Sequence, residues 1–290
     1  MICRLCPRNC GAERTEETGG GLCAMPTLPV VAKAMLHQWE EPCLVGEKGA
    51  GAVFFSGCNL RCCFCQNGVI SRQGFGKTVS IARLREIFRQ LIGQGAACLD
   101  LVTPTHFTPA VLQALGEEDW GVPVVWNCGG YEKVETLRTL EGKVQVYLPD
   151  LKYALPGPAK RYSAAEDYFE VASAAILEMF RQTGPCRMEG GQLKSGVLIR
   201  HLLLPGELEN TRRVIDWVAA NFREGDVLFS LMSQYTPQSG ARGNLARPVT
   251  RAEYRAAMQY MENCGITHGF TQERTSAKEE YTPVFDLQGI

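Results

Sequence analysis

The sequence predicts an α/β protein in which repeated strand–helix units follow a small cysteine-rich segment. Two patterns predict this class. From residue 51 onward, apolar stretches rich in β-branched residues alternate with amphipathic stretches. Nine of the 13 cysteines lie within the first 65 residues. Continuous apolar strands that alternate with helices are typical of a parallel sheet whose faces are covered by helices.

The expected elements alternate through most of the chain. The apolar stretches are GAVFFSG, ACLDLVT, VPVVWN, VQVYLPD, GVLIRHLLLPG and DVLFSLMS. Helices are expected near residues 80–94, 109–116, 131–141, 164–183, 209–222 and 251–264. Six such units are fewer than the eight that close a complete barrel. The sheet is therefore expected to be either open and doubly wound or a curved, incomplete barrel.

Polar and thiol groups follow each apolar stretch. The segments after the strands are SGCNLRCCFC, TPTHFTP, NCGGYE, PDLKY, RHLLLPG and SQYTP. In both designs the functional residues lie at the carboxyl ends of the strands. The sequence therefore predicts one ligand pocket at this rim.

Composition excludes several classes of partner. The formal net charge of -1 provides no basic field for nucleic acid. The apolar stretches are far shorter than the roughly 20 residues of a membrane-spanning helix. The segment MICRLCPRNCGAER has charges and cysteines where a signal peptide has an apolar core. We therefore expect a cytoplasmic protein, in which clustered cysteines indicate metal binding or catalysis.

The densest cysteine cluster follows the first strand. Cys58, Cys62 and Cys65 have the spacing C-x3-C-x2-C, with Cys63 as an extra residue. Structural zinc usually requires two separated C-x2-C pairs, whereas one loop can wrap three corners of a cubane [4Fe-4S] cluster. Three thiolates would leave one iron free to bind a small molecule. We expect the Cys63 side chain to point elsewhere.

This motif, with the aromatic Phe64 before its last cysteine, resembles the signature of the radical S-adenosylmethionine (SAM) superfamily. The resemblance implies a partial (β/α)6 TIM-like barrel and SAM bound at the open iron. It also implies an oxidoreductase-type enzyme that makes a 5′-deoxyadenosyl radical to abstract hydrogen. An electron donor such as flavodoxin or ferredoxin would be needed. Electron transfer by a non-catalytic iron–sulfur protein is the alternative from another functional class.

Residues 51 to about 236 most resemble the activating enzymes of glycyl-radical proteins, of the pyruvate formate-lyase type. The resemblance makes the substrate a glycyl-radical protein, and the alternative is a small molecule or a peptide side chain. PDLKY and LIRHLLLPG match segments that contact SAM in that group. The cofactor-binding candidates carried over, or placed at the same rim, are Phe64, Thr105, Asn127, Gly129, Gly130, Asp150, Lys152, Arg200 and Gln234.

One segment departs from this resemblance. The family usually has a Gly-Gly-Glu type motif after the second strand, where this chain has TPTHF at residues 103–107. His106 is the candidate catalytic residue there, as a proton donor or part of an electron path. Because cofactor and substrate meet at this position, the substrate need not be that of the activating enzymes.

A second set of cysteines lies at the amino terminus. Cys3, Cys6, Cys10 and Cys23 have the spacing C-x2-C-x3-C-x12-C. Four thiols on a short loop suit structural zinc or a fully ligated second [4Fe-4S] cluster. We expect residues 1–50 to form a metal-binding cap and residues 51–290 the barrel, with a C-terminal extension over its open side.

Overall fold

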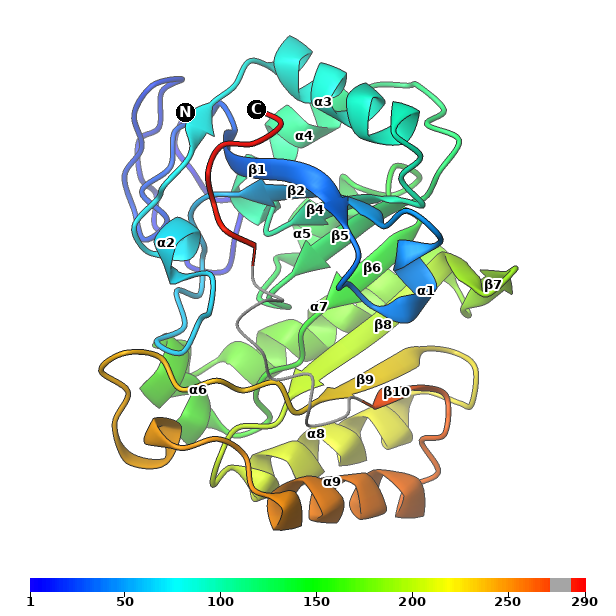
Figure 1. Ribbon diagram of the computed structural model, residues 1–290. Helices are drawn as coiled ribbons and strands as arrows, with labels where there is room; N and C mark the ends of the chain where they lie inside the picture. Colours follow the sequence, from blue (N-terminus) through cyan, green and yellow to red (C-terminus); the bar gives the residue numbers. More distant parts are fainter. Residues whose placement is uncertain (272–282) are drawn as a thin grey trace.

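The protein folds around one curved, mostly parallel sheet. The computed structural model describes residues 1–271 and 283–290. The sheet follows the order β10-β9-β8-β6-β5-β4-β2-β1-β3. Its six principal parallel strands are β2 (Ala50–Phe55), β4 (Leu99–Val102), β5 (Val124–Cys128), β6 (Val146–Pro149), β8 (Gln192–Leu202) and β9 (Leu228–Met232). The six predicted strands are confirmed, and the sheet is the incomplete barrel (Figure 1).

Helices cover the outer side of this sheet (Figure 1). They are α3 (Ile81–Gly93), α4 (Thr108–Leu115), α5 (Val134–Arg138), α7 (Tyr168–Thr183), α8 (Leu208–Asn221) and α9 (Arg251–Asn263). A further helix, α6 (Pro156–Ser163), precedes α7 where the sequence predicts no separate helix. Pro156 stands at its first position, where the missing backbone N–H is not needed.

Four short helices lie between the longer elements. They are α1 (Pro42–Val45), α2 (Gly68–Ser71), η1 (Thr105–Phe107) and η2 (Gly243–Ala246). The two-residue strand β3 (Lys77–Thr78) forms one edge of the sheet, and β7 (Arg187–Glu189) pairs with β8 off the main path. The parallel strand β10 (Gly269–Thr271) forms the other edge.

The expected boundary at residue 50 is wrong, because it cuts through the sheet. Strand β1 (Val30–His37) belongs to the predicted cap but pairs antiparallel with β2. Its sequence VVAKAMLH is β-branched and apolar at its start, and Val31 and Ala32 are fully buried. Only residues before β1 form the N-terminal segment, which lies beside α2 (Figure 1).

The C-terminal residues attach to this same strand. Ala34 N–H donates to the Gln288 carbonyl at 2.9 Å, and Leu287 N–H donates to the Ala32 carbonyl at 3.2 Å. Lys33 pairs with Asp286 at 3.0 Å. The predicted cover over the open side includes residues 272–282, which lie outside the described residues.

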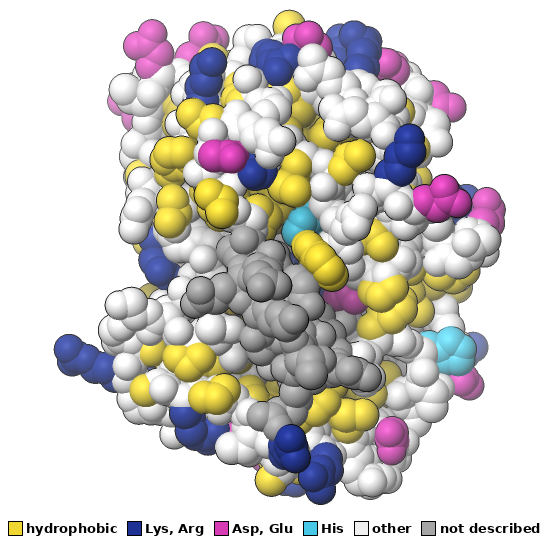
Figure 2. Space-filling model, in the orientation of Figure 1, with side chains coloured by type: hydrophobic (Ala, Val, Ile, Leu, Met, Phe, Trp, Pro, Cys, Tyr) yellow, Lys and Arg dark blue, Asp and Glu magenta, His cyan; other side chains and the backbone are white. Residues whose placement is uncertain are grey.

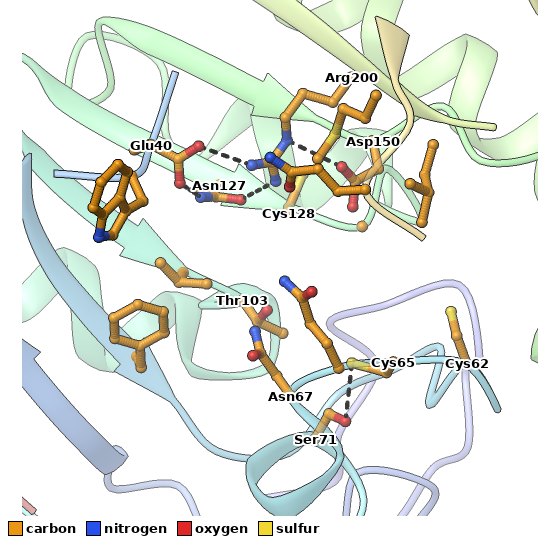
Figure 3. Close-up of a pocket in the computed structure, with 18 of the residues that line it drawn as sticks. Glu40, Cys62, Cys65, Asn67, Ser71, Thr103, Asn127, Cys128, Asp150 and Arg200 are labelled. Atoms are coloured by element: carbon orange, nitrogen blue, oxygen red, sulfur yellow. Dashed lines mark hydrogen bonds and ion pairs between the residues drawn. The ribbon is translucent and has the colours of Figure 1, made fainter. Parts of the chain in front are cut away.

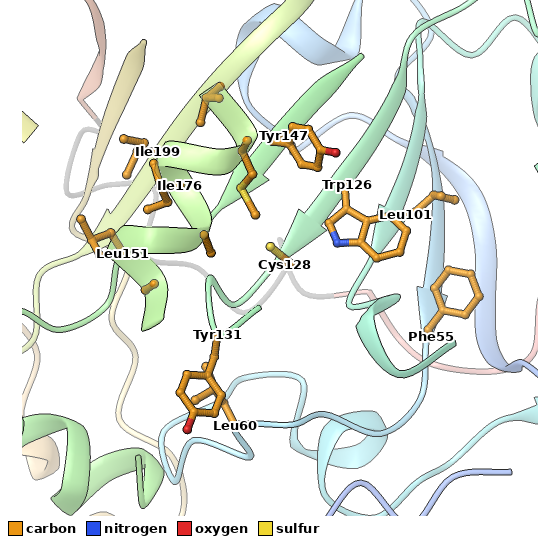
Figure 4. Close-up of a cluster of buried hydrophobic side chains, with 14 of the residues drawn as sticks. Phe55, Leu60, Leu101, Trp126, Cys128, Tyr131, Tyr147, Leu151, Ile176 and Ile199 are labelled. Carbon is orange, nitrogen blue, oxygen red and sulfur yellow. The ribbon is translucent and has the colours of Figure 1, made fainter. Parts of the chain in front are cut away.

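Because side chains alternate along each strand, one face of the sheet packs against the helices and the other faces the site. Successive side chains of a strand point to opposite faces. In β8, Val197 and Ile199 belong to the large core under the helices, while Leu198 packs with the smaller inner cluster. Figure 4 shows part of the large core around Trp126 and Tyr147. His201 faces away from the inner side, and its ring nitrogens contact the Leu151 carbonyl and the Thr211 hydroxyl.

No helix among the described residues combines the length and apolarity that a bilayer crossing requires.

Candidate functional site

The carboxyl ends of the parallel strands border one cavity with a volume of 560 Å³. One wall is the cysteine loop after β2, and the opposite wall carries charged side chains from β6 and β8 (Figure 3). The cavity reaches the surface at Trp39, which is 61% exposed. Hydrophobic side chains gather on the face of the molecule shown in Figure 2. The predicted pocket at this rim is therefore present, with two chemically different walls.

The thiol wall consists of Cys58, Cys62 and Cys65, all of which line the cavity. Each sulfur accepts a hydrogen bond from the chain. The Leu60 N–H donates to Cys58 Sγ at 3.4 Å, and the Ser71 hydroxyl donates to Cys65 Sγ at 3.4 Å. Such bonds stabilise thiolates and tune iron–sulfur clusters.

The bond to Cys62 is the shortest of the three. The Ser163 hydroxyl, at the end of α6, donates to Cys62 Sγ at 2.9 Å. Burial raises the pKa of Cys58 to about 12, and the neighbouring thiols Cys62 and Cys65 add to that effect. The three thiols therefore lie close enough to influence one another. Cys63 is exposed and does not line the cavity.

The thiol wall fits a cluster better than a single ion. In residues 1–271 and 283–290, no three His, Cys, Asp or Glu side chains lie close enough to hold one metal ion. Thiolates on one zinc ion lie within about 4 Å of each other, because each Zn–S bond is about 2.3 Å. The corners of a cubane cluster are further apart. Three thiols on one loop that influence one another electrostatically suit a [4Fe-4S] cluster.

The charged wall is organised by Arg200. Its guanidinium donates to Asp150 Oδ1 at 3.1 Å, to Glu40 Oε1 at 3.0 Å and to Asn127 Oδ1 at 2.6 Å. Asn127 donates in turn to Glu40 Oε2 at 3.1 Å. Lys152 Nζ contacts Asp150 Oδ2 at 2.5 Å. These side chains form one hydrogen-bonded network along the cavity (Figure 3).

Opposite charges hold this network in its ionised form. Burial alone would raise the pKa of Asp150, but Lys152 and Arg200 lower it below its ordinary value. Burial would lower the pKa of Lys152, and Asp150 together with Cys62 raises it instead. The Lys152 ammonium is therefore the cation that links the two walls electrostatically.

Two carboxyl groups beside this network have raised pKa values, in contrast to Asp150. Burial, reinforced by Glu40, raises the pKa of Glu41 to about 7. Burial and Glu40 also raise the pKa of Asp100, which accepts a hydrogen bond from Asn127 at 3.3 Å. Both groups favour the protonated form near the ionised network.

Glu40 is the functional-site residue that sequence analysis missed. It lies in the segment HQWEEP between β1 and α1, where acidic residues resemble ordinary surface charges. The available indication was Arg200, since a buried guanidinium needs an anionic partner. The sequence analysis placed Arg200 among the SAM contacts, whereas Glu40 and Asp150 are its anionic partners within the chain.

Most predicted cofactor contacts line the cavity. They are Phe64, Asn127, Gly129, Asp150, Lys152, Arg200 and Gln234. Thr103 also lines it, with a positive φ of 60° that is unusual for a β-branched residue.

Three predicted residues lie elsewhere. Gly130 approaches the backbone of Asp150, whose carbonyl oxygen would be 2.1 Å from an added Cβ, so the glycine serves chain packing. The Thr105 hydroxyl donates to the buried Glu132 at 2.6 Å. His106 is 2% exposed, and its Nε2 contacts the Ser56 carbonyl at 2.7 Å. None of the three lines the cavity.

His106 is therefore not placed to transfer a proton within this cavity. Burial lowers its pKa to about 4, so the ring is neutral at physiological pH. It supports the backbone directly before the cysteine loop. The expected catalytic role of His106 does not fit this geometry, because the 3-10 turn of TPTHF directs the imidazole under the cysteine loop.

The four N-terminal cysteines come together in the structure. Burial raises the pKa of Cys6 to about 11, with smaller contributions from Cys23 and Cys3. Burial likewise raises the pKa of Cys23, with contributions from Cys3 and Cys10. We refer to Cys3, Cys6, Cys10 and Cys23 as the N-terminal quartet.

Comparison with known proteins gives the fold a wider context. No family model matches the chain. An uncharacterized protein of Methanocaldococcus jannaschii is 28% identical over 281 residues, which cover 91% of this chain and 75% of that protein. A radical SAM methyltransferase from Sphaerobacter thermophilus superimposes with a TM-score of 0.52 and 14% identity over 77% of this chain.

A second solved structure is SuiB of Streptococcus suis bound to S-adenosylmethionine, with a TM-score of 0.53 and 12% identity over 75% of this chain. The chain spans 66% of the methyltransferase and 48% of SuiB, so it is shorter than both. At these identities the similarity establishes the fold. The chain has the partial-barrel fold found in radical SAM proteins.

Proposed function

We propose that this chain is a radical SAM enzyme whose substrate is a polypeptide. The observation that carries the proposal is the cavity itself. Three thiols from one loop face a preformed charged wall across a cavity of 560 Å³, at the rim where the parallel strands end. The fold shared with radical SAM proteins supports the same conclusion.

Cys58, Cys62 and Cys65 would hold the [4Fe-4S] cluster. When bound, this group supplies the electron that cleaves the carbon–sulfur bond of SAM, yielding methionine and a 5′-deoxyadenosyl radical that removes hydrogen from the substrate. The protein binds and orients the reactants. Lys152 and Asp150 are the charged groups best placed to contact the methionine portion. Both line the cavity, and Lys152 interacts electrostatically with Cys62.

Other lining residues suit the adenosine portion. Phe64 and Tyr235 place their ring centroids 6.4 Å apart on the cavity side of the cysteine loop. Gln234 supplies an amide beside them. Aromatic surface with one amide can hold a nucleobase by packing and hydrogen bonding. Arg200 acts through Asp150 and Asn127, because its guanidinium is already engaged by Glu40 and both of these residues.

Two features support a polypeptide substrate. The cavity opens beside the exposed Trp39, and large apolar side chains at a cavity mouth suit peptide contacts. SuiB has also been solved with the precursor peptide SuiA bound, at a TM-score of 0.51 to this chain. Activation of a glycyl-radical protein is a second candidate, supported by the resemblance of PDLKY to that group.

The test of radical SAM chemistry is anaerobic reconstitution with iron and sulfide, followed by SAM and dithionite. We expect release of 5′-deoxyadenosine, measured by liquid chromatography. Cys62→Ala should abolish the product, and the matched variant Cys63→Ala should retain it, because Cys63 is exposed outside the cavity. Loss of product in Cys63→Ala alone, or no product from the wild type, would overturn the proposal.

The substrate class needs a separate measurement. Candidate peptides and glycyl-radical proteins encoded beside the gene should be offered in deuterated form. Deuterium should appear in 5′-deoxyadenosine with a polypeptide substrate. Transfer from deuterated small molecules, with none from polypeptides, would contradict this part of the proposal.

A further inference from the structure

A buried charge without a carboxylate partner lies beside Cys3 of the N-terminal quartet. Arg14 is 1% exposed, and within the described parts of the chain it forms no ion pair with a carboxylate. Its guanidinium donates to the carbonyls of Met25 and Pro26 and, at 3.4 Å, to Cys3 Sγ. A buried cation requires a compensating anion. Thiolates bound to a metal centre would supply that negative charge, and neutral thiols would not.

The quartet also lacks the convergence of a single-ion site. In the residues that the structure describes, no three of these thiols lie close enough to bind one ion. Gly21 packs against Cys10, because an added Cβ there would be 2.7 Å from the Cys10 sulfur, so a larger residue would displace this thiol. A four-thiolate iron–sulfur cluster holds its ligands farther apart than a single zinc ion does, so it does not require that convergence.

Arg8, between Cys6 and Cys10, joins the quartet to the thiol wall. Its guanidinium donates to the Asn59 carbonyl at 2.8 Å, inside the cysteine loop. It also donates to the carbonyls of Ser163 and Ala164 at the end of α6. A cation at a helix C-terminus is stabilised by the helix dipole. The ring of Tyr131 lies 5.1 Å from the guanidinium and completes its surroundings.

The helix end held by Arg8 contacts the first cluster site directly. Ser163 uses its carbonyl to accept from Arg8 and its hydroxyl to donate to Cys62 Sγ. A second link is Arg61, which donates to the carbonyl of Leu22, the residue before Cys23. The two cysteine sets are thus connected through two arginines and one serine.

We propose that the N-terminal quartet binds a [4Fe-4S] cluster of its own and that Arg8 is a positioning residue for Cys62. The positioning role rests on the proposed radical SAM function, whereas the metal assignment does not. Groups that orient metal ligands typically change metal affinity or activity about 10- to 100-fold when they are removed.

The metal assignment is tested on the full chain, reconstituted with iron and sulfide in the presence of zinc. We expect about eight iron atoms per wild-type chain, and about four in the double variant Cys6→Ala/Cys10→Ala. Zinc should not replace the second set. One zinc with about four iron atoms in the wild type, or unchanged iron in the double variant, would overturn the assignment.

The positioning role is tested with Arg8→Gln against Arg4→Gln. Arg4 is exposed in the same segment, and its side chain makes no hydrogen bond or ion pair within the described residues. Arg8→Gln should keep the iron content and change the electron paramagnetic resonance signal of the reduced cluster with SAM. It should also raise the Kd for SAM about tenfold. Identical spectra and Kd values in both variants would overturn the role.

Further measurements distinguish a folding defect of Arg8→Gln from failure of the radical SAM proposal. Ser163→Ala removes the hydroxyl that contacts Cys62 and Tyr153 and keeps the carbonyl that accepts from Arg8, so it should reproduce the altered spectrum if Arg8→Gln does not fold. An unaltered Ser163→Ala spectrum would then count against the positioning role. If wild-type protein with about eight iron atoms releases no 5′-deoxyadenosine, the radical SAM proposal fails while the quartet assignment stands.

Discussion

The two walls of the cavity differ in how far the chain completes them by itself. On the charged wall, Arg200, Asp150, Glu40 and Asn127 satisfy one another. On the thiol wall, the three sulfurs accept hydrogen bonds from uncharged groups of Leu60, Ser71 and Ser163. One wall is thus preorganised by internal ion pairs, and the other is arranged for a group that the chain does not itself contain.

This difference indicates how each wall should respond to change. Breaking an internal buried ion pair leaves a charge without a partner, so it should affect the fold. Removing a thiol should affect the bound group and leave the fold nearly unchanged. The predictions below test this contrast, beginning with the largest expected effect.

Arg200→Ala should cost about 3–5 kcal/mol in the free energy of unfolding, because it leaves Glu40 buried without a cation and Asp150 with Lys152 alone. Cys58→Ala should cost at most about 1 kcal/mol in the same metal-free background, because it removes one sulfur atom from a partly exposed residue and breaks no ion pair among the described residues. Urea unfolding measures both values. Equal losses in the two variants would refute the contrast between the walls.

The thiol wall was predictable from sequence, and the charged wall only in part. Cysteine spacing is local, so three ligands within eight residues were evident without a structure. Asp150, Lys152 and Arg200 were carried over from the family resemblance, and all three line the cavity. Glu40 joins Arg200 across 160 positions of sequence, and no local pattern indicates such a contact.

The errors have related physical causes. β1 was missed because its strand pattern lies next to a segment dominated by Cys, Gly and Pro. His106 follows a strand end and was therefore expected at the rim. The 3-10 turn η1 (Thr105–Phe107) instead buries it against Ser56. Strand order predicts which segments reach the rim, while turn geometry decides which of their side chains enter the cavity.

The charged wall should also show a pH response through Glu41. Its pKa in the folded chain is about 7, against an ordinary value of 4.5, because of burial and the nearby Glu40. Between these two values the unfolded chain ionises while the folded chain keeps the proton. Stability should therefore fall as pH rises through this window and level off above about pH 7.

The matched variant Glu41→Gln should lack this loss. Relative to the variant, wild-type protein should lose roughly 2 kcal/mol between pH 4.5 and pH 7, with Arg200 and Asp150 common to both proteins. Unfolding curves at several pH values measure the difference. Parallel pH dependence of the two proteins would show that Glu41 is ionised in the folded state.

The smallest expected effect concerns Thr103, which lines the cavity with a φ of 60°. A β-branched residue is strained in this conformation, and glycine is not. Thr103→Gly should therefore be more stable than Thr103→Ala by about 1 kcal/mol, because alanine retains the Cβ that causes the strain. Thermal unfolding should show a difference of about 2 °C. If strain at this position keeps the cavity wall in place, Thr103→Gly should also form 5′-deoxyadenosine more slowly than Thr103→Ala. A glycine variant that is less stable than the alanine variant would mean that the surrounding contacts, and not the residue type, determine this backbone conformation.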